Sequence, residues 1–404
     1  MYAVVVILLF IAALAYFWLV REGLLSHPAA KVAAGLLLLL AIGLRYPAMG
    51  HATPDYEIFL SVWVQHFRDN GGFAALADPI GNYNLPYLYF LALFSYIPID
   101  DLYLIKLLSI LFDMILAWYA MRILGLYTSS AAKRLFTFFL VLFLPTVFLN
   151  GAVWGQCDSI YAAFALMALY YAMKGDGLYA CIFVSLSLAF KLQAIFILPA
   201  FLLFLLSGRV RLWHLLACPL TYLLCILPAV MLGHSFSSAI LFYVNTAGTA
   251  GSGLNYNSPS LFAFLSGGTQ DAMLGKVGIA AAFLLVILIY AGLWKQRKSL
   301  SNETLLAASL LFVVGIPLLL PHMHDRYFFL ADVLAVPFGL SRLRRMPVPV
   351  LIQFASLLGY HAYLLQRYLL PMKYGAAALV LAAALLILEL RGQEKGAFRG
   401  SRHA

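Results

Sequence analysis

Four short polar clusters in an otherwise apolar chain carry the residue types that group-transfer chemistry needs. The clusters are Pro-Asp-Tyr-Glu at 54–57, Trp-Gly-Gln-Cys-Asp at 154–158, Lys-Leu-Gln at 191–193 and His-Met-His-Asp-Arg-Tyr at 322–327. A carboxylate can take a proton from an attacking hydroxyl while fixed cations stabilise a departing phosphate. The sequence contains no Walker, GxGxxG or GxSxG motif that would point to another chemistry.

The elements that must position these clusters are predicted to be membrane helices. Of the 404 residues, 64% are hydrophobic and 10% are charged, whereas soluble domains carry roughly 25% charged residues. One core cannot bury so much apolar surface, and backbone groups in hydrocarbon must pair within helices or closed barrels. Because the apolar runs are continuous and do not alternate, we predict an all-α polytopic integral membrane protein, forming a single membrane-embedded domain over 1–404.

The apolar runs predict about 13 transmembrane helices, some of them shorter than the ~20 residues that a perpendicular span needs. The predicted ranges are 1–20, 32–46, 102–122, 135–150, 159–174, 177–190, 192–207, 213–232, 277–294, 305–320, 328–340, 349–366 and 375–390. Two longer segments between them, 47–101 and 234–275, are predicted to be outer loops. The first should carry interfacial or re-entrant helices, and loops of that length usually serve function.

The distribution of charge predicts the orientation. If alternate loops are cytoplasmic from 21–31 onward, most of the 26 Lys and Arg residues fall on that side, including the basic tail 391–404. The N-terminus is then outside, the C-terminus is cytoplasmic, and the four polar clusters face the extracytoplasmic side of a plasma (inner) membrane. The net charge of +10 is therefore interpreted as contact with anionic lipids, with no nucleic-acid partner.

Several of the polar motifs resemble those of a known family. Asp55-Tyr56-Glu57, followed by Asn-Leu-Pro-Tyr-Leu-Tyr at 84–89, looks like the catalytic loop of GT-C glycosyltransferases. The segment 152–159 is similar to one in mannosyltransferases related to those that build the glycolipid (GPI) anchor of proteins. Residues 323–326 resemble the His-Glu-Lys type motif of dolichol-linked glucosyltransferases, with Asp and Arg replacing Glu and Lys. The similarity extends over most of the chain from about Arg45 to Arg326.

The resemblance implies a GT-C-like helical bundle and an inverting glycosyltransferase. Such enzymes take a sugar, here expected to be mannose, from a polyprenyl-phosphate donor and transfer it to a lipid-linked or other extracytoplasmic glycan hydroxyl. Carried over to this sequence, Asp55 is the general base, and Lys191, His324 and Arg326 hold the donor phosphate. The predicted substrate-binding residues are Glu57, Trp154, Gln156, Asp158 and Gln193.

The sequence predicts no resident cofactor and leaves a divalent cation open. Asp55, Glu57 and Asp158 supply carboxylate oxygens of the kind that Mg²⁺ or Mn²⁺ accepts. Three carboxylates in loops do not establish such a site, because Lys191 and Arg326 can neutralise the donor phosphate without a metal. The expected partners are the donor, the glycan acceptor and membrane lipids.

Most candidate residues also have a purely structural interpretation. Asp55 is a favoured N-cap for a helix beginning near Ile58, and Asp158 is one for a helix beginning at Ser159. Trp154 and Tyr327 suit an interfacial aromatic belt, and a lysine such as Lys191 can extend its ammonium group to the membrane surface. A separate pair, Lys106 and Asp113, lies seven residues apart within one apolar run and is predicted to make a structural contact.

Two other functional classes also fit a polytopic protein. A lipid flippase or solute transporter would place polar residues near the midplane in inverted repeats, and no internal repeat is evident here. A lipid-linked saccharide polymerase or ligase would share the sidedness, but it typically has a large, late, arginine-rich outer loop. The long segment 47–101 is early and acidic, which favours the transferase.

Overall fold

The computed structural model describes residues 1–246, 251–265 and 271–400, and it describes side chains up to residue 392. The predicted second outer loop, 234–275, therefore falls partly outside the described residues, as do the last four residues of the predicted basic tail. The chain is predominantly helical, and the described part contains one two-stranded sheet.

Within the described residues, seven helices are long and apolar enough to cross a membrane, which confirms an α-helical, multi-pass membrane protein. They are α1 (Tyr2–Arg21), α2 (Pro28–Ala48), α5 (Asp101–Leu124), Leu212–Met231 (η5 and α11), Ala272–Gln296 (α14 and η7), α15 (Asn302–Leu319) and Lys373–Gly392 of α18. The predicted span 135–150 is instead two helical pieces, Ala131–Leu142 and Pro145–Trp154, bent by 47°. Counting this bent pair as one span makes eight.

Helices also occupy the other predicted ranges, but several of them are shorter than a membrane is thick. They are α8 (Asp158–Lys174), α9 (Gly177–Phe190), Leu192–Leu206 (η4 and α10), α16 (Phe329–Ser341) and α17 (Pro347–Leu364). Of these, α9 has 14 residues and α16 has 13. The total of 13 spans therefore remains a prediction.

The chain divides into two compact units. Unit 1 comprises Met1–Tyr170, Leu178–Ala194 and Trp213–Thr249, and unit 2 comprises Tyr171–Gly177, Ile195–Leu212 and Ala250–Ala404. The shorter elements of unit 1 include α6 (Ala131–Leu142), α7 (Pro145–Phe148), η3 (Leu149–Trp154), α12 (Phe236–Ile240) and α13 (Phe242–Thr246). Unit 2 also contains η6 (Leu261–Phe264), η8 (Leu343–Arg345) and α18 (Lys373–Gly400).

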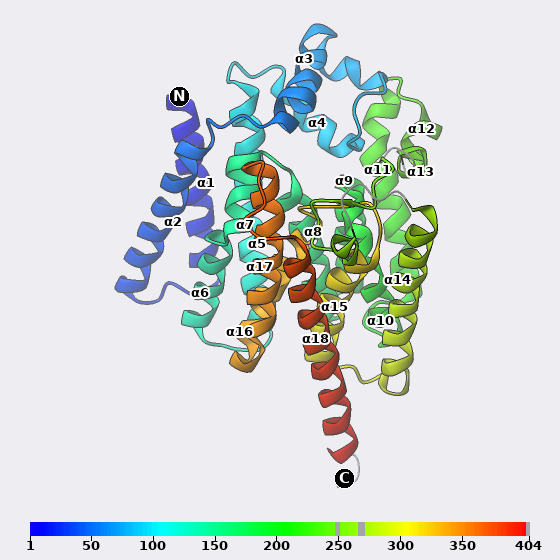
Figure 1. Ribbon diagram of the computed structural model, residues 1–404. Helices are drawn as coiled ribbons and strands as arrows, with labels where there is room; N and C mark the ends of the chain where they lie inside the picture. The colour runs from blue at the N-terminus through cyan, green and yellow to red at the C-terminus, as the bar shows by residue number, and fades with distance from the viewer. Residues whose placement is uncertain (247–250, 266–270, 401–404) are drawn as a thin grey trace. The chain divides into compact units, whose positions relative to one another are not determined.

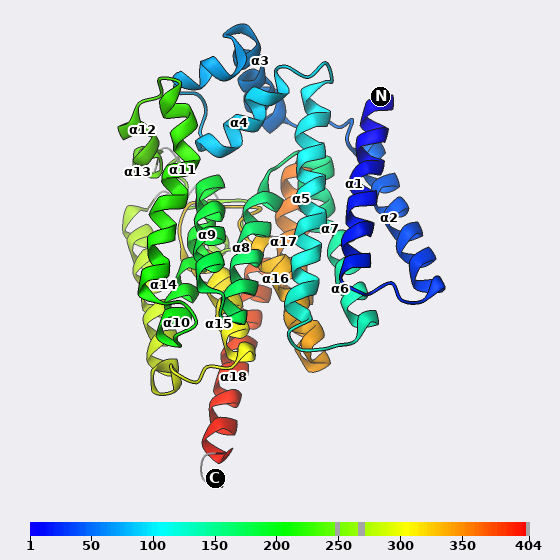
Figure 2. The ribbon, with the colours of Figure 1, turned by 180° about the vertical axis from the view of Figure 1, so that it is seen from behind.

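Helix α5 is the most buried span of unit 1, and it packs against α1 and α6 (Figure 2). Inside this packing, the carboxylate of Asp113 accepts hydrogen bonds from Arg45 Nη2 at 3.2 Å and Ser159 Oγ at 2.5 Å. The predicted partner Lys106 instead donates to backbone carbonyls. Asp113 makes a structural contact, as predicted. Its cationic partner is Arg45 of α2 and not Lys106, because Asp113 of α5 faces α2.

The predicted outer segment 47–101 folds into four short helices of unit 1. They are the π-helix η1 (Tyr56–Leu60), α3 (Ser61–Asp69), the 3₁₀-helix η2 (Gly72–Ala77) and α4 (Leu85–Phe94). The Asn84 side chain caps α4 by accepting a hydrogen bond from the amide of Leu85, and Pro86 fits the first turn of that helix. Figure 1 shows α3 and α4 at the end of unit 1 where α5 begins.

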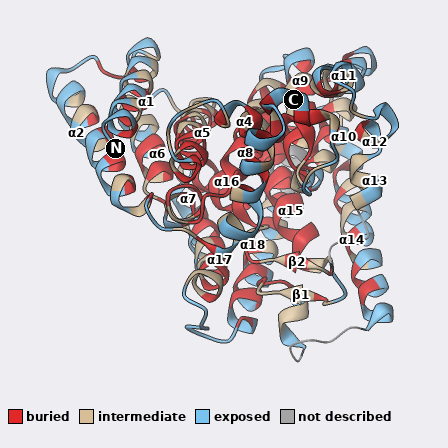
Figure 3. Cartoon of the chain, turned by 90° about the horizontal axis from the view of Figure 1, so that it is seen from above, coloured by how far each residue is buried: buried red, intermediate tan, exposed pale blue. Residues whose placement is uncertain are grey.

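Unit 2 is built around α15, of which 83% is buried within the structure, compared with 22% of α14 (Ala272–Leu293). Figure 3 shows this contrast between the two helices. Helices α10 (Leu198–Leu206), α14, α16 and α18 pack against α15. Strand β1 (Asn255–Tyr256) pairs in parallel with β2 (Met323–His324), which joins the chain after residue 250 to the predicted His-Asp-Arg motif.

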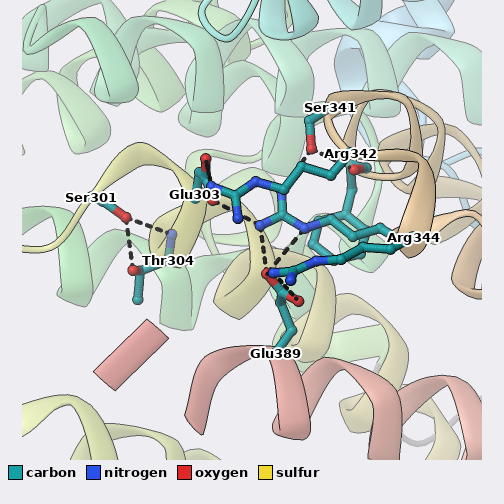
Figure 4. Close-up of polar contacts among 9 residues, drawn as sticks. Ser301, Glu303, Thr304, Ser341, Arg342, Arg344 and Glu389 are labelled. Carbon is teal, nitrogen blue, oxygen red and sulfur yellow. Dashed lines mark hydrogen bonds and ion pairs between the residues drawn. The ribbon is translucent and has the colours of Figure 1, made fainter. Parts of the chain in front are cut away.

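An ion cluster connects three elements of unit 2 (Figure 4). The guanidinium of Arg345, on η8, donates to Glu303 at the start of α15 at 2.8 Å and to Glu389 of α18 at 2.6 Å. On the more exposed side, Arg342 bonds Glu303 and Arg344 bonds Glu389. These basic residues, which the charge pattern places in loops, are therefore also structural links between helices.

Candidate active site

The carboxylate of Asp55 is held by two hydrogen-bond donors from a distant part of unit 1. Trp154 Nε1 lies 2.9 Å and Gln156 Nε2 lies 2.8 Å from Asp55 Oδ2. Asp55 precedes η1 but makes no side-chain capping bond to it, so the helix-cap interpretation is wrong. The two donors instead fix the direction in which the carboxylate points.

The backbone around Trp154 explains how two residues so close in sequence reach one oxygen atom. Trp154 ends the π-helix η3, and Gly155 has φ +80°, a left-handed conformation that favours glycine. Thr53 Oγ1 also donates to the Trp154 carbonyl at 3.1 Å. The Trp154 side chain is fully buried, so the interfacial-belt interpretation is wrong for this residue. The helices next to these residues, η1 after Asp55 and η3 ending at Trp154, are both π-helical, a geometry that often occurs at functional sites.

Lys106 connects the chain just before Asp55 to the chain just before Trp154. Its fully buried ammonium group donates to the carbonyls of His51 at 2.6 Å and Val153 at 2.9 Å. A buried ammonium must be hydrogen-bonded, so this arrangement fixes the chain just before Asp55 and just before Trp154. Sequence reasoning missed this role, although a lone lysine within an apolar helix is a usable signal.

A second polar cluster of unit 1 contains Lys191, Asp158 and Asn150. Lys191 Nζ bonds Asp158 Oδ1, and Asn150 Nδ2 donates to Asp158 Oδ2 at 2.8 Å. All three side chains are buried. Lys191 therefore does not extend its ammonium group to a membrane surface, because it forms an ion pair with a carboxylate that is itself a predicted site residue.

Tyr83 connects the two clusters and was not predicted. Its hydroxyl donates to Gln156 Oε1 at 3.1 Å, and the Lys191 ammonium lies 5.4 Å from the centre of its ring. That second distance allows a cation–π contact. Because Gln156 bonds Asp55 through its other amide atom, polar contacts run continuously from Asp55 to Lys191. The adjacent Asn84 was part of the recognised motif, but nothing in the local sequence pointed to Tyr83.

Two further predicted residues of unit 1 lie outside these hydrogen-bond clusters. The Glu57 side chain is exposed, and it makes no hydrogen bond or ion pair with the residues that the structure describes. Gln193 is half-buried, and its Oε1 is buried without a partner among those same residues. Nor do three His, Cys, Asp or Glu side chains of the described ranges gather closely enough to hold a metal ion.

His324 and Arg326 belong to unit 2. His324 lies on β2, where its ring stacks on Tyr256 with centroids 4.7 Å apart and an interplanar angle of 14°. Arg326 Nη1 lies 3.6 Å from Asp325 Oδ1. The pairing of β2 with β1 at 255–256 therefore fixes the position of this motif. The motif does not lie on one face of a helix.

No protein-family model matches the chain, and no curated protein matches it.

Proposed function

We propose that the protein is an inverting GT-C-type glycosyltransferase. It moves a sugar, with mannose as the expected one, from a polyprenyl-phosphate donor to a hydroxyl of a lipid-linked or surface glycan. The observation that supports this most is the Asp55 carboxylate, oriented by Trp154 and Gln156 and connected through Tyr83 to the Lys191 ammonium. A fixed base and a fixed cation in one polar network are what this displacement needs.

In the proposed reaction, Asp55 takes the proton of the acceptor hydroxyl as its oxygen attacks C1 of the sugar. The bond from C1 to the phosphate oxygen breaks on the opposite face, and the electron pair leaves with the polyprenyl phosphate. Lys191 stabilises the charge that this phosphate gains. General-base catalysis contributes typically ~10²–10⁴-fold to the rate.

The ion pair with Asp158 is compatible with this role of Lys191. An ammonium group has three N–H donors, and Asp158 Oδ1 takes one of them. The pairing also limits the rotamers of the lysine, so less entropy is lost when a phosphate binds. By resemblance alone, the proposal also assigns phosphate binding to His324 and Arg326, and substrate binding to Glu57 and Gln193.

The proposed membrane arrangement follows the charge pattern of the loops. The chain would cross a plasma membrane about 13 times as a GT-C-like bundle, with its N-terminus outside and its C-terminus in the cytoplasm. Asp55 would then act at the extracytoplasmic surface, where the donor phosphate meets water while its polyprenyl chain stays in the bilayer.

The test is a transfer assay with purified protein in lipid nanodiscs. Radiolabelled polyprenyl-phosphate mannose, glucose and N-acetylglucosamine are each supplied with a membrane lipid extract as the source of acceptor. We expect label from the mannose donor to enter the extract, with one polyprenyl phosphate released per sugar. Transport of intact donor across liposomes without bond cleavage would instead identify a flippase, and would refute the transferase.

A further inference from the structure

Two adjoining cavities lie in the outer segment of unit 1, apart from the Asp55 cluster. Their volumes are about 540 and 490 Å³, and Arg68 and Asp101 line both of them. The first is completed by residues 95–100, and the second by residues of η1 and α3 with Asn70. Together they form an open polar surface along α3 and the start of α5.

Arg68 and Asp101, which line both cavities, form a hydrogen-bonded group with Tyr56, which lines the second. Arg68 Nη1 lies 3.0 Å from Asp101 Oδ1, and the Tyr56 hydroxyl donates to Asp101 Oδ2 at 3.1 Å. Burial and the nearby Asp101 carboxylate raise the pKa of Tyr56, so its hydroxyl stays protonated and keeps donating. Arg68 retains 32% of its side-chain exposure, compared with 11% for Asp101, so the guanidinium is accessible from the cavities.

The lining suits a ligand that carries many hydroxyl groups. Gln65, Asn70 and Ser61 add amide and hydroxyl groups that both donate and accept hydrogen bonds. On the other side, the aromatic ring of Tyr96 lines the first cavity, and its stacking on Phe73, with ring centroids 5.6 Å apart, holds it beside the polar groups. Apolar ring faces together with a few placed polar groups are the usual composition of a small-molecule site.

The charge of the lining discriminates between possible ligands. One arginine faces three aspartates, Asp69, Asp100 and Asp101, so the formal net charge is −2 with His66 neutral. Like charges placed together are costly, so this surface disfavours a phosphate or an anionic lipid headgroup. An uncharged saccharide meets no such penalty.

We propose that the two cavities bind the neutral saccharide chain of the acceptor, an inference that rests on the proposed function. The link to the reaction is the dipeptide Asp55-Tyr56, whose neighbouring Cα atoms are ~3.8 Å apart. The Tyr56 side chain forms the cavity wall, while the Asp55 carboxylate lies with Trp154 and Gln156. In this proposal, a glycan lying along Arg68 extends past Tyr56, so that its terminal hydroxyl reaches the base.

The test measures saccharide binding without donor or turnover. Mannotriose, cellotriose and chitotriose are titrated into the full-length protein in nanodiscs and followed by saturation-transfer NMR, with mannose 6-phosphate as the anionic probe. We expect at least one trisaccharide to bind and mannose 6-phosphate not to bind. The double variant Gln65→Ala/Asp69→Ala removes an exposed pair that is hydrogen-bonded at 2.8 Å. It should weaken trisaccharide binding at least ~10-fold, which is about the effect of one lost polar contact.

The matched control is Lys174→Ala/Asp176→Ala, which removes another exposed polar pair and should leave binding unchanged. Tyr56→Phe, which deletes only the hydroxyl on the cavity wall, should weaken it. Binding by none of the trisaccharides, equal binding by the double variant, or binding of mannose 6-phosphate would overturn the proposal. If the protein transfers sugar but binds no trisaccharide, this binding site is refuted and the transferase proposal is not. If it binds a trisaccharide but transfers no sugar, the transferase proposal is refuted and this binding site is not.

Discussion

At Asp55, basicity and shape can be separated by substitution. Asp55→Asn keeps the shape and one acceptor oxygen but removes the base, whereas Asp55→Glu keeps the base and moves it by one methylene. Because proton transfer needs an approach of about 3 Å, we expect both variants to lose at least ~10²-fold in sugar transfer. Donor binding, measured in parallel, should survive.

The exposed neighbour Glu57 supplies the control for this prediction. Glu57→Gln removes one negative charge, as Asp55→Asn does, but at a side chain with no described partner. The Glu57→Gln variant should therefore lose less activity than the Asp55→Asn variant. A purely structural Asp55 would behave differently, because asparagine can still accept a hydrogen bond from Trp154 or Gln156. Transfer by Asp55→Asn within a few-fold of wild type would remove Asp55 as the base.

Lys191 needs a different design, because its removal leaves the buried Asp158 carboxylate unpaired. Breaking a buried pair in this way typically costs about 3–5 kcal/mol, whatever the function of the lysine. The double variant Lys191→Met/Asp158→Asn removes both charges and should recover much of that loss, as measured by thermal unfolding in detergent. If Lys191 also holds the donor phosphate, the stable double variant will still bind a polyprenyl-phosphonate sugar at least ~10-fold more weakly, the loss expected for one charge-assisted contact. Full recovery of donor affinity would make Lys191 structural.

At the scale of elements, the ion cluster of unit 2 predicts which arginine holds the helices together. Arg345 is 2% exposed and bonds both Glu303 and Glu389, whereas Arg344 is 65% exposed and bonds Glu389 alone among the described residues. Arg345→Met should lower the free energy of unfolding by about 1.5–3 kcal/mol, because Arg342 and Arg344 still pair with Glu303 and Glu389. The matched change Arg344→Met should cost about 0–1 kcal/mol.

Thermal unfolding of the two variants in the same detergent measures this difference. Equal shifts in Tm for Arg345→Met and Arg344→Met would show that the cluster does not join α15, η8 and α18. Because the cluster belongs to unit 2 and contains none of the proposed catalytic residues, the folded fraction of either variant should bind donor as the wild type does.

At the scale of the whole molecule, the charge pattern of the loops predicts the sidedness of the chain. Asn82 and Ser299 are both exposed and lie in loops assigned to opposite sides. In a background without the four native cysteines, Asn82→Cys should react with an impermeant maleimide on intact cells. Ser299→Cys should react only after the cells are opened. Labelling of Ser299→Cys from outside would reverse the orientation and move Asp55 to the cytoplasmic side.

The sequence by itself determined the class of fold, because continuous apolar runs are a local property that the bilayer requires of each helix separately. It also identified the residue types of the site, since carboxylates, amides and a lysine stand out in an apolar chain. It did not determine the number of spans. The range 135–150 reads as one apolar run, but the helix breaks before Pro145 and bends by 47°.

Only the tertiary structure decided which polar groups meet. Helical periodicity suggested Lys106 as the partner of Asp113, yet packing gives Asp113 an arginine 68 residues away and gives Lys106 two backbone carbonyls. Likewise, Asp55 receives donors 99 and 101 residues away in place of the local cap that its position suggested. A buried polar group must find a partner, but which partner it finds depends on how helices distant in sequence pack against one another.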